Sequence, residues 1–144
     1  MKHQLIGIFA TILLIINSSC EKQIPTVLTG HFYTTDSSAN DNDIKLWIDG
    51  VDKGYLPFIN QAFTDSLQID STLLQQTLAV TFMSGTHQIQ AIRTNGTVIA
   101  SSRMYFEFYK NKTKSGVQSD IGAAGHILQN NPTRLVIWLA QTIK

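Results

Sequence analysis

The chain has 144 residues and a single cysteine, Cys20, and its 11 lysine and arginine residues nearly balance its 10 aspartate and glutamate residues. Only Lys2 among the basic residues precedes Cys20, so the chain beyond that cysteine is neutral and offers no electrostatic footprint for nucleic acid. This length allows one domain with a hydrophobic core, and one cysteine allows no disulfide within the chain.

Residues 1–19 have the pattern of a secretory signal peptide. Lys2 and His3 give a positive start, and residues 5–16 are apolar or small throughout. This run is too short for a transmembrane helix, which takes about 20 residues. Serine fills the two positions before Cys20, which suits a peptidase with a narrow pocket. We therefore expect an exported protein whose leader is removed close to Cys20.

The stretch "LLIINSSC" resembles the bacterial lipoprotein signal, in which the cysteine sulfur receives a diacylglycerol and cleavage leaves that cysteine first. It departs from the usual pattern at Asn17, where leucine is expected. The resemblance implies acyl chains such as palmitate on Cys20, a membrane anchor made of these chains, and a place in the bacterial cell envelope, facing the periplasm or the cell surface. More than one acyl chain meets the requirement for stable anchoring. The alternative is an ordinary signal peptide, which would leave an unpaired thiol on an exported protein.

Residues 20–26 are polar and contain Pro25, which predicts a short tether into one folded domain over residues 27–144. Residues 27–35 mix β-branched and aromatic side chains and predict the first strand.

The next strand signal is "IKLWID" at residues 44–49, where apolar side chains alternate with polar ones and Trp47, the period of a half-buried strand. The glycines of "DGVDKG" predict a chain reversal. Residues 55–59 would then form the returning strand, with Pro57 ending its pairing early.

Residues 60–77 form the least strand-like part and are interpreted as an insertion. Within it, Thr72 followed by Gln75 is a capping-box pattern, which predicts a short helix inside residues 70–78. We expect this helix to cover an edge or an end of a sheet.

The strand pattern strengthens from residue 78. The runs "LAVTFM" and "HQIQAIR" flank "SGT", which predicts a tight hairpin, and Asn95-Gly96 predicts a second hairpin with a type I′ turn. Residues 103–109 alternate between a core face and an amphipathic face, and after a loop "RLVIWLA" is apolar on both faces, as in the middle of a sheet. About seven short strands joined by hairpins predict an all-β protein, a single antiparallel β-sandwich of immunoglobulin-like type with one short helix.

"LWIDGVDKGYLP" followed by "MSGTHQIQAI" resembles the PEGA-type β-sandwich modules of bacterial envelope proteins. Those modules pair a strand ending in Asp-Gly with a short turn, a second glycine and a proline, followed by a Gly-x-His hairpin. The naming tetrapeptide is absent here, and residues 60–77 interrupt the match. The resemblance implies a PEGA-like sandwich at the envelope that binds or scaffolds and does not catalyse.

Beyond Cys20 the histidines are His31, His87 and His126, and the sequence has no Gly-x-Ser-x-Gly elbow, no His-Glu-x-x-His helix and no phosphate loop. We expect no enzymatic activity and no cofactor. The Asp- and Asn-rich loop at residues 36–43 could supply oxygen ligands to calcium, but it lacks the EF-hand positions and its residues also favour solvated turns. A metal site is therefore not predicted, and the calcium alternative stays open.

Three aromatic residues, Trp47, Tyr105 and Tyr109, are candidates for an outward binding patch, because they alternate with core positions on their strands. The alternative is that both faces of the sandwich are covered and these rings are core. The lysines of "YKNKTKSG" are interpreted as a solvated turn, with contact to lipid headgroups as the alternative.

The triplets "DSL" and "DST" are similar to the sites at which some Gram-negative bacteria attach O-glycans to exported proteins, which makes Ser66 and Ser71 candidate acceptors. Taken together, the sequence predicts a lipid-anchored envelope protein that binds or supports another envelope protein or a glycan. The alternative function is a carbohydrate-binding module with an aromatic face.

Overall fold

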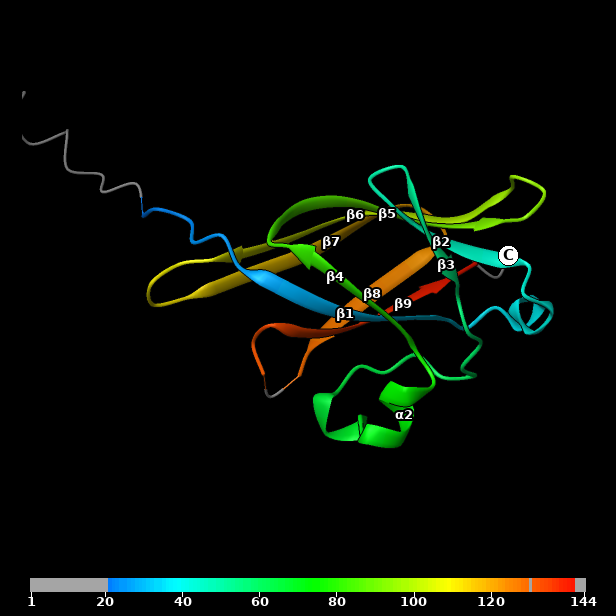
Figure 1. Ribbon diagram of the computed structural model, residues 1–144, viewed down its shortest axis with the longest axis horizontal. Coiled ribbons are helices and arrows are strands. Elements are labelled where there is room, and N and C mark those ends of the chain that lie inside the picture. Colours follow the sequence, from blue (N-terminus) through cyan, green and yellow to red (C-terminus); the bar gives the residue numbers. More distant parts are fainter. Residues whose placement is uncertain (1–20, 130, 142–144) are drawn as a thin grey trace, which may run out of the picture.

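The computed structural model describes residues 21–129 and 131–141, and it is a sandwich of two β-sheets (Figure 1). Cys20 and the predicted leader lie outside the described residues. The four-stranded sheet has the order β4 (Leu78–Met83), β1 (Val27–Thr34), β9 (Arg134–Ala140) and β8 (Ala123–Leu128). The five-stranded sheet has the order β3 (Val51–Tyr55), β2 (Ile44–Ile48), β5 (Gly85–Arg93), β6 (Val98–Phe108) and β7 (Thr113–Ile121). The expectation of a single all-β sandwich with one short α-helix is confirmed.

Adjacent strands run antiparallel, with one exception. β1 and β9 pair in parallel, with Phe32 opposite Ile137. This pairing puts the first and the last strand of the described chain side by side in the middle of the four-stranded sheet.

The main core lies between the two sheets and follows from the period-two pattern of the strands. Each strand turns alternate side chains inward, and those of β2 and β6 alternate as the sequence predicts. The largest fully buried side chains of this core are Leu28, Phe32, Ile44, Leu46, Leu56, Ile89, Met104, Phe106, Leu135, Ile137 and Leu139.

A second, smaller core lies on the outer face of the four-stranded sheet. Tyr33 of β1 and Val136 of β9 point outward there and are covered by Phe63, with Ile59 and Leu73 packed against them. The covering segment includes the 3-10 turn η2 (Ser66–Gln68) and the helix α2 (Ser71–Gln75), which lie below this sheet in Figure 1. The insertion therefore covers a face of the sheet, where the prediction had an edge or an end, and this explains why β9 is apolar on both sides.

The returning strand after β2 is earlier than predicted. Asp49 has φ 51° and Gly50 has φ 78°, so both residues form a tight turn that puts Ile48 opposite Val51. β3 therefore ends where residues 55–59 were expected to begin. The hairpin at Asn95-Gly96 is confirmed, but its turn is not of type I′, because Gly96 has φ 87° and Asn95 is not among the described residues with positive φ.

The expected hairpin around "SGT" is wrong. β4 pairs with β1, whereas β5 pairs with β2 and β6, so the chain crosses from one sheet to the other at Ser84. The segment before "RLVIWLA", where a loop is expected, contains two strands, β7 (Thr113–Ile121) and β8 (Ala123–Leu128). β7 is an edge strand with mostly exposed polar side chains, so it lacks the apolar alternation that marks a half-buried strand.

The short helix is confirmed, but its cap is not Thr72. The carboxylate of Asp70 accepts the Leu73 N–H at 2.8 Å, and Asp65 accepts the Leu67 N–H at 2.9 Å in the same way. Aspartate is among the strongest helix caps. The two capping aspartates, Asp65 and Asp70, are the first residues of the two predicted glycosylation triplets, so each has a structural role of its own.

Gly122 lies where the chain passes from β7 to β8. It has φ 65°, and a Cβ there would lie 2.5 Å from the carbonyl oxygens of Ile99 and Ala140. Gly122→Ala should lower the free energy of unfolding by about 3 kcal/mol, because backbone strain adds to a clash with backbone atoms. Gly50→Ala is the matched control, since Gly50 has φ 78° and open space around it, and should cost about 1 kcal/mol. Equal midpoints in urea unfolding would contradict the close approach.

His126 on β8 should make the stability of the domain depend on pH. Its Nδ1 is buried without a hydrogen-bond partner among the described residues, its ring packs against Phe106 with centroids 5.1 Å apart, and burial lowers its pKa. Burial and the charge of Arg134 also lower the pKa of His31. The unfolded chain therefore takes up these protons more readily, so stability falls as pH drops below about 6.5.

Melting temperatures measured at steps of pH test this dependence. His126→Leu should flatten the fall between about pH 7 and pH 5, while the loss below about pH 4 from aspartates with lowered pKa stays. A wild-type melting temperature that is constant across the upper window would contradict the assignment.

Candidate binding face

The outer face of the five-stranded sheet, which we call the open face, differs from the covered face of the other sheet. Thr86, Arg103, Tyr105, Lys114 and Gln118 are exposed on it. Lys45, Trp47, Gln88, Gln90 and Glu107 are half-buried on it. Its aromatic and arginine side chains belong to the residue types that are enriched at binding surfaces.

Two shallow hollows lie on the open face. The first has a volume of about 450 Å³ and is lined by Thr86, Arg103, Tyr105, Glu107, Lys114 and Gln118. The second has a volume of about 270 Å³ and is lined by Lys45, Trp47, Tyr55, Ile92, Arg93 and Thr94. Each hollow therefore has an aromatic ring beside cationic groups.

The structure places the three predicted aromatic residues apart. Trp47 pairs with Gln90 and, across β5, with Ser101, which is four residues from Tyr105 on β6. Strand spacing and rise then separate the Cα atoms of Trp47 and Tyr105 by roughly 16 Å. Tyr109 lies beyond the end of β6 and donates its hydroxyl hydrogen bond to Glu107 at 2.7 Å. The three rings form no single platform, but two of them mark the two hollows.

A row of amides joins the hollows. The side-chain amide of Gln88 donates to Ser101 Oγ at 2.7 Å, and that of Gln90 donates to the same oxygen at 3.3 Å. Amide groups offer both donors and acceptors, so this row can exchange hydrogen bonds with hydroxyl or peptide groups of a ligand.

Sequence reasoning missed the charged neighbours of the aromatic rings. Lys45 lies 2.8 Å from Asp52 and 5.1 Å above the Tyr55 ring. The hydrogen bond from Lys45 lowers the pKa of the Asp52 carboxyl, and the same bond raises the pKa of Lys45. Lys45 alternates with Trp47 along β2, so the strand period alone could have placed both on one face.

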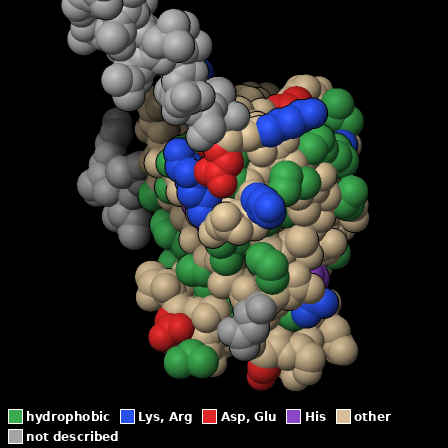
Figure 2. All heavy atoms as spheres, turned by 90° about the vertical axis from the view of Figure 1, so that its left-hand side faces the viewer, with side chains coloured by type: hydrophobic (Ala, Val, Ile, Leu, Met, Phe, Trp, Pro, Cys, Tyr) green, Lys and Arg blue, Asp and Glu red, His purple; other side chains and the backbone are tan. Residues whose placement is uncertain are grey.

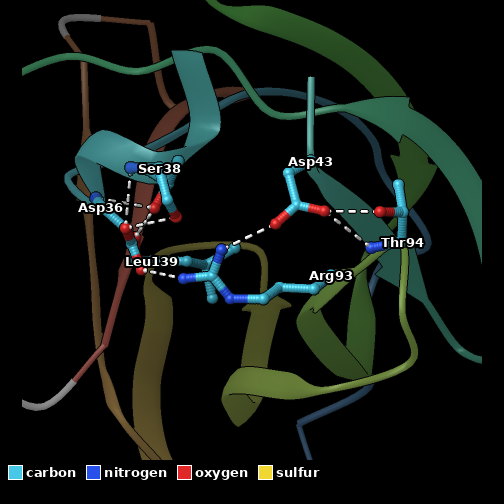
Figure 3. Close-up of polar contacts among 7 residues, drawn as sticks. Asp36, Ser38, Asp43, Arg93, Thr94 and Leu139 are labelled. Carbon is cyan, nitrogen blue, oxygen red and sulfur yellow. Dashed lines mark hydrogen bonds and ion pairs between the residues drawn. The ribbon is translucent and has the colours of Figure 1, made fainter. Parts of the chain in front are cut away.

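The loop at residues 36–43 is fastened to the β5–β6 turn. Arg93 donates to Asp43 at 2.7 Å and to Asp36 at 3.2 Å, and Figure 3 shows its guanidinium group between the two carboxylates. Hydrogen bonds from Thr94 and from Arg93 hold the pKa of Asp43 below its ordinary value. Asp36 also accepts the Ser38 N–H at 3.0 Å and caps the 3-10 turn η1 (Ser37–Asp41). Asp36 and Asp43 thus bind the guanidinium group of Arg93. A calcium site in this loop would need the same carboxylates as ligands of the metal ion.

Two of the histidines, His31 and His87, have hydrogen-bond partners within the fold. Nδ1 of His87 lies 2.7 Å from Asp49 Oδ2, and its Nε2 lies 2.8 Å from the Met83 carbonyl oxygen. Nδ1 of His31 lies 2.9 Å from Thr77 Oγ1. Burial raises the pKa of Asp49, but hydrogen bonds from His87 and from the Gln88 N–H outweigh it and lower the pKa overall. A His–Asp pair exists here, but the second nitrogen of the ring already faces a backbone acceptor.

The candidate acceptors for O-glycans differ in access, since Ser66 is half-buried and Ser71 is exposed. Both remain predictions, as does acylation of Cys20, which lies outside the described residues. Among residues 21–129 and 131–141 no helix is long and apolar enough to cross a bilayer. Nor does this part of the chain gather three histidine, cysteine, aspartate or glutamate side chains in a way that could hold a metal ion.

Comparison with protein-family models, with curated proteins and with solved structures gives no match for this chain. The resemblances to the lipoprotein signal and to PEGA-type modules therefore depend on the residues of this chain alone.

Proposed function

We propose that this protein is an exported binding module, held at the bacterial cell envelope by acyl chains on Cys20, that contacts its partner through the open face and performs no catalysis. The observation that carries the binding role is the contrast between the two outer faces. One is covered by the insertion and forms a second core, whereas the other displays Trp47, Tyr105 and Arg103. A sheet face with aromatic and arginine side chains in shallow hollows is typical of interaction surfaces.

The arrangement of the histidines supports a role without catalysis. A general base needs a ring nitrogen that can reach a substrate proton. In His87 both ring nitrogens face acceptors within the fold, and His126 packs edge-on against Phe106.

The two motifs of the PEGA-like resemblance contact each other, which supports an envelope module of that kind. The Asp49 carboxylate, at the Asp-Gly turn, accepts the Gln88 N–H at 2.9 Å and lies next to His87 of the Gly-x-His segment. The motif residues therefore fix the β2–β3 turn against β5.

A carbohydrate ligand is the second candidate, favoured by the chemistry of the open face. Sugar rings stack on aromatic faces, and their hydroxyl groups bond to amide and charged side chains such as Gln88, Gln90 and Arg103. The face is longer than one sugar ring, so an oligosaccharide would suit it better than a monosaccharide.

A glycan array probed with the acylated protein in detergent separates the two candidates. A carbohydrate module should prefer defined saccharides, and Trp47→Ala should weaken that binding by about thirtyfold while leaving the melting temperature close to that of the wild type. Val51→Ala, at an exposed apolar residue of β3, is the control. A protein-binding module should show no saccharide preference, and a Trp47→Ala protein that fails to fold would make Trp47 a core residue.

A further inference from the structure

The residues that follow Cys20 contact one end of the sandwich through hydrogen bonds and an ion pair. The Ile24 N–H donates to the Phe108 carbonyl oxygen at 2.7 Å, and the Ser84 N–H donates to the Thr26 carbonyl oxygen at 2.7 Å. Glu21 forms an ion pair with Lys112 of the β6–β7 turn. Glu21 directly follows Cys20 in the sequence, and adjacent Cα atoms are only about 3.8 Å apart, so an anchor on Cys20 would be attached next to a residue that contacts this turn.

This end of the molecule is basic, although the chain beyond Cys20 is neutral. Residues 21–26 and 107–114 contain four lysines and two glutamates, whereas the remainder of the chain beyond Cys20 contains six basic and eight acidic residues. Figure 2 looks onto this end and shows lysine and arginine side chains gathered on it. The lysines are Lys22, Lys110, Lys112 and Lys114, and all four are exposed.

Tyr109 adds an aromatic ring to the basic end. The ammonium groups of Lys112 and Lys114 lie 5.2 Å and 5.5 Å from its centroid. Tyrosine with neighbouring lysine is typical of the membrane–water interface, where the ring lies at headgroup level and the ammonium groups reach phosphates.

We propose that the β6–β7 turn lies against anionic phospholipid headgroups of the bilayer that anchors Cys20, so that this end of the sandwich faces the membrane. The proposal depends on the proposed acylation of Cys20 and adds an orientation to it. Lysines near an anionic surface are attracted over about a Debye length, roughly 10 Å, which the short attachment to Cys20 keeps within reach.

The orientation has a consequence for the open face. β6 has 11 residues and runs from the basic end to the β5–β6 turn, a length of about 36 Å. In Figure 1 these two turns lie at opposite ends of the long axis. The Tyr105 hollow would lie near the lipid and the Trp47 hollow away from it. A ligand of the Trp47 hollow would therefore approach from the side of the domain that faces away from the membrane.

A spin-labelled lipid can measure this orientation in the acylated full chain. Acylation consumes Cys20, so one engineered cysteine carries a fluorophore, at Asn111 in the β6–β7 turn or at Asn95 in the β5–β6 turn as the matched position. The protein is reconstituted into vesicles of phosphatidylcholine, with or without phosphatidylglycerol, that contain a lipid with a nitroxide on its headgroup. We expect quenching at Asn111 to be several-fold stronger than at Asn95, and stronger still with phosphatidylglycerol.

Charge variants test whether the lysines cause the effect. Lys110→Gln/Lys112→Gln removes two of the four lysines and should clearly reduce the increase due to phosphatidylglycerol, whereas Lys45→Gln/Lys53→Gln, with the same change in net charge, should keep it. Equal quenching at the two positions in protein that floats with the vesicles would overturn the orientation and leave the anchor intact. Protein that does not float with the vesicles would overturn both the orientation and the proposed acylation.

Discussion

Phe106→Ala should lower the free energy of unfolding by about 4 kcal/mol, because it leaves a cavity between the two sheets. Phe106 is 1% exposed, and its ring contacts two residues of the four-stranded sheet, Phe82 at a centroid distance of 5.9 Å and His126 at 5.1 Å. Domains of this size are stable by only about 5–15 kcal/mol, so one such loss removes a large part of the total. Urea unfolding followed by tryptophan fluorescence measures the change.

Two further variants make the core prediction specific. Phe106→Leu keeps most of the apolar volume and should cost clearly less than alanine. Leu67→Ala alters a side chain that is 85% exposed and should change the stability by less than about 0.5 kcal/mol. If Phe106→Ala unfolds at the same urea concentration as Leu67→Ala, the position of the Phe106 side chain between the two sheets is wrong.

Loss of Cys20 should release the protein from the membrane almost completely. In the proposed anchor the free energy would come from acyl chains, at about 0.8 kcal/mol per buried methylene. Among the described residues no helix is long and apolar enough to span a membrane. The test compares the wild type with Cys20→Ser placed behind a conventional secretory leader, because an uncut apolar leader could itself hold the protein at the membrane. Fractionation in a Gram-negative host, with a high-salt wash, should put the wild type in the membrane and the variant in the soluble fraction.

The matched control in that experiment keeps Cys20. Ser71→Ala changes an exposed serine of the insertion and should leave the protein in the membrane fraction. A Cys20→Ser protein that stays bound through the high-salt wash would show that another part of the chain anchors it.

Two strands that the sequence predicted correctly, β2 and β6, have one buried face and one face that is more exposed. The alternation around Met104 and Phe106 follows burial directly, and the three aliphatic residues of β2 are buried. The edge strand β7 was missed because it buries little and Gly116 interrupts its pattern. The Tyr105 ring lies across Gly116, where a Cβ would be 2.4 Å from the ring, so a neighbouring strand supplies the packing that the glycine lacks.

Which strands pair with which could not be predicted from local sequence. Glycine in "SGT" indicates a turn, but a turn between sheets and a turn within a hairpin use the same residue types. The expected hairpin there was wrong for that reason. The parallel contact of β1 with β9 joins segments about a hundred residues apart in sequence. The residues of neither strand indicate which other strand it pairs with.

The candidate binding face was only partly predictable. The strand period placed Trp47 and Tyr105 outward, but their separation depends on β5 lying between β2 and β6. Arg93 could not be paired with Asp36 and Asp43 from sequence, because this contact forms between a loop and a distant turn.

The mass of the N-terminal peptide of the native protein, released by protease from washed membranes, tests the central claim most directly. Our account predicts that this peptide begins at Cys20 and carries the mass of a diacylglycerol on the sulfur, with or without a further acyl chain on the amine. A peptide that still contains residues 1–19, or one that begins near Cys20 with an unmodified thiol, would contradict the account.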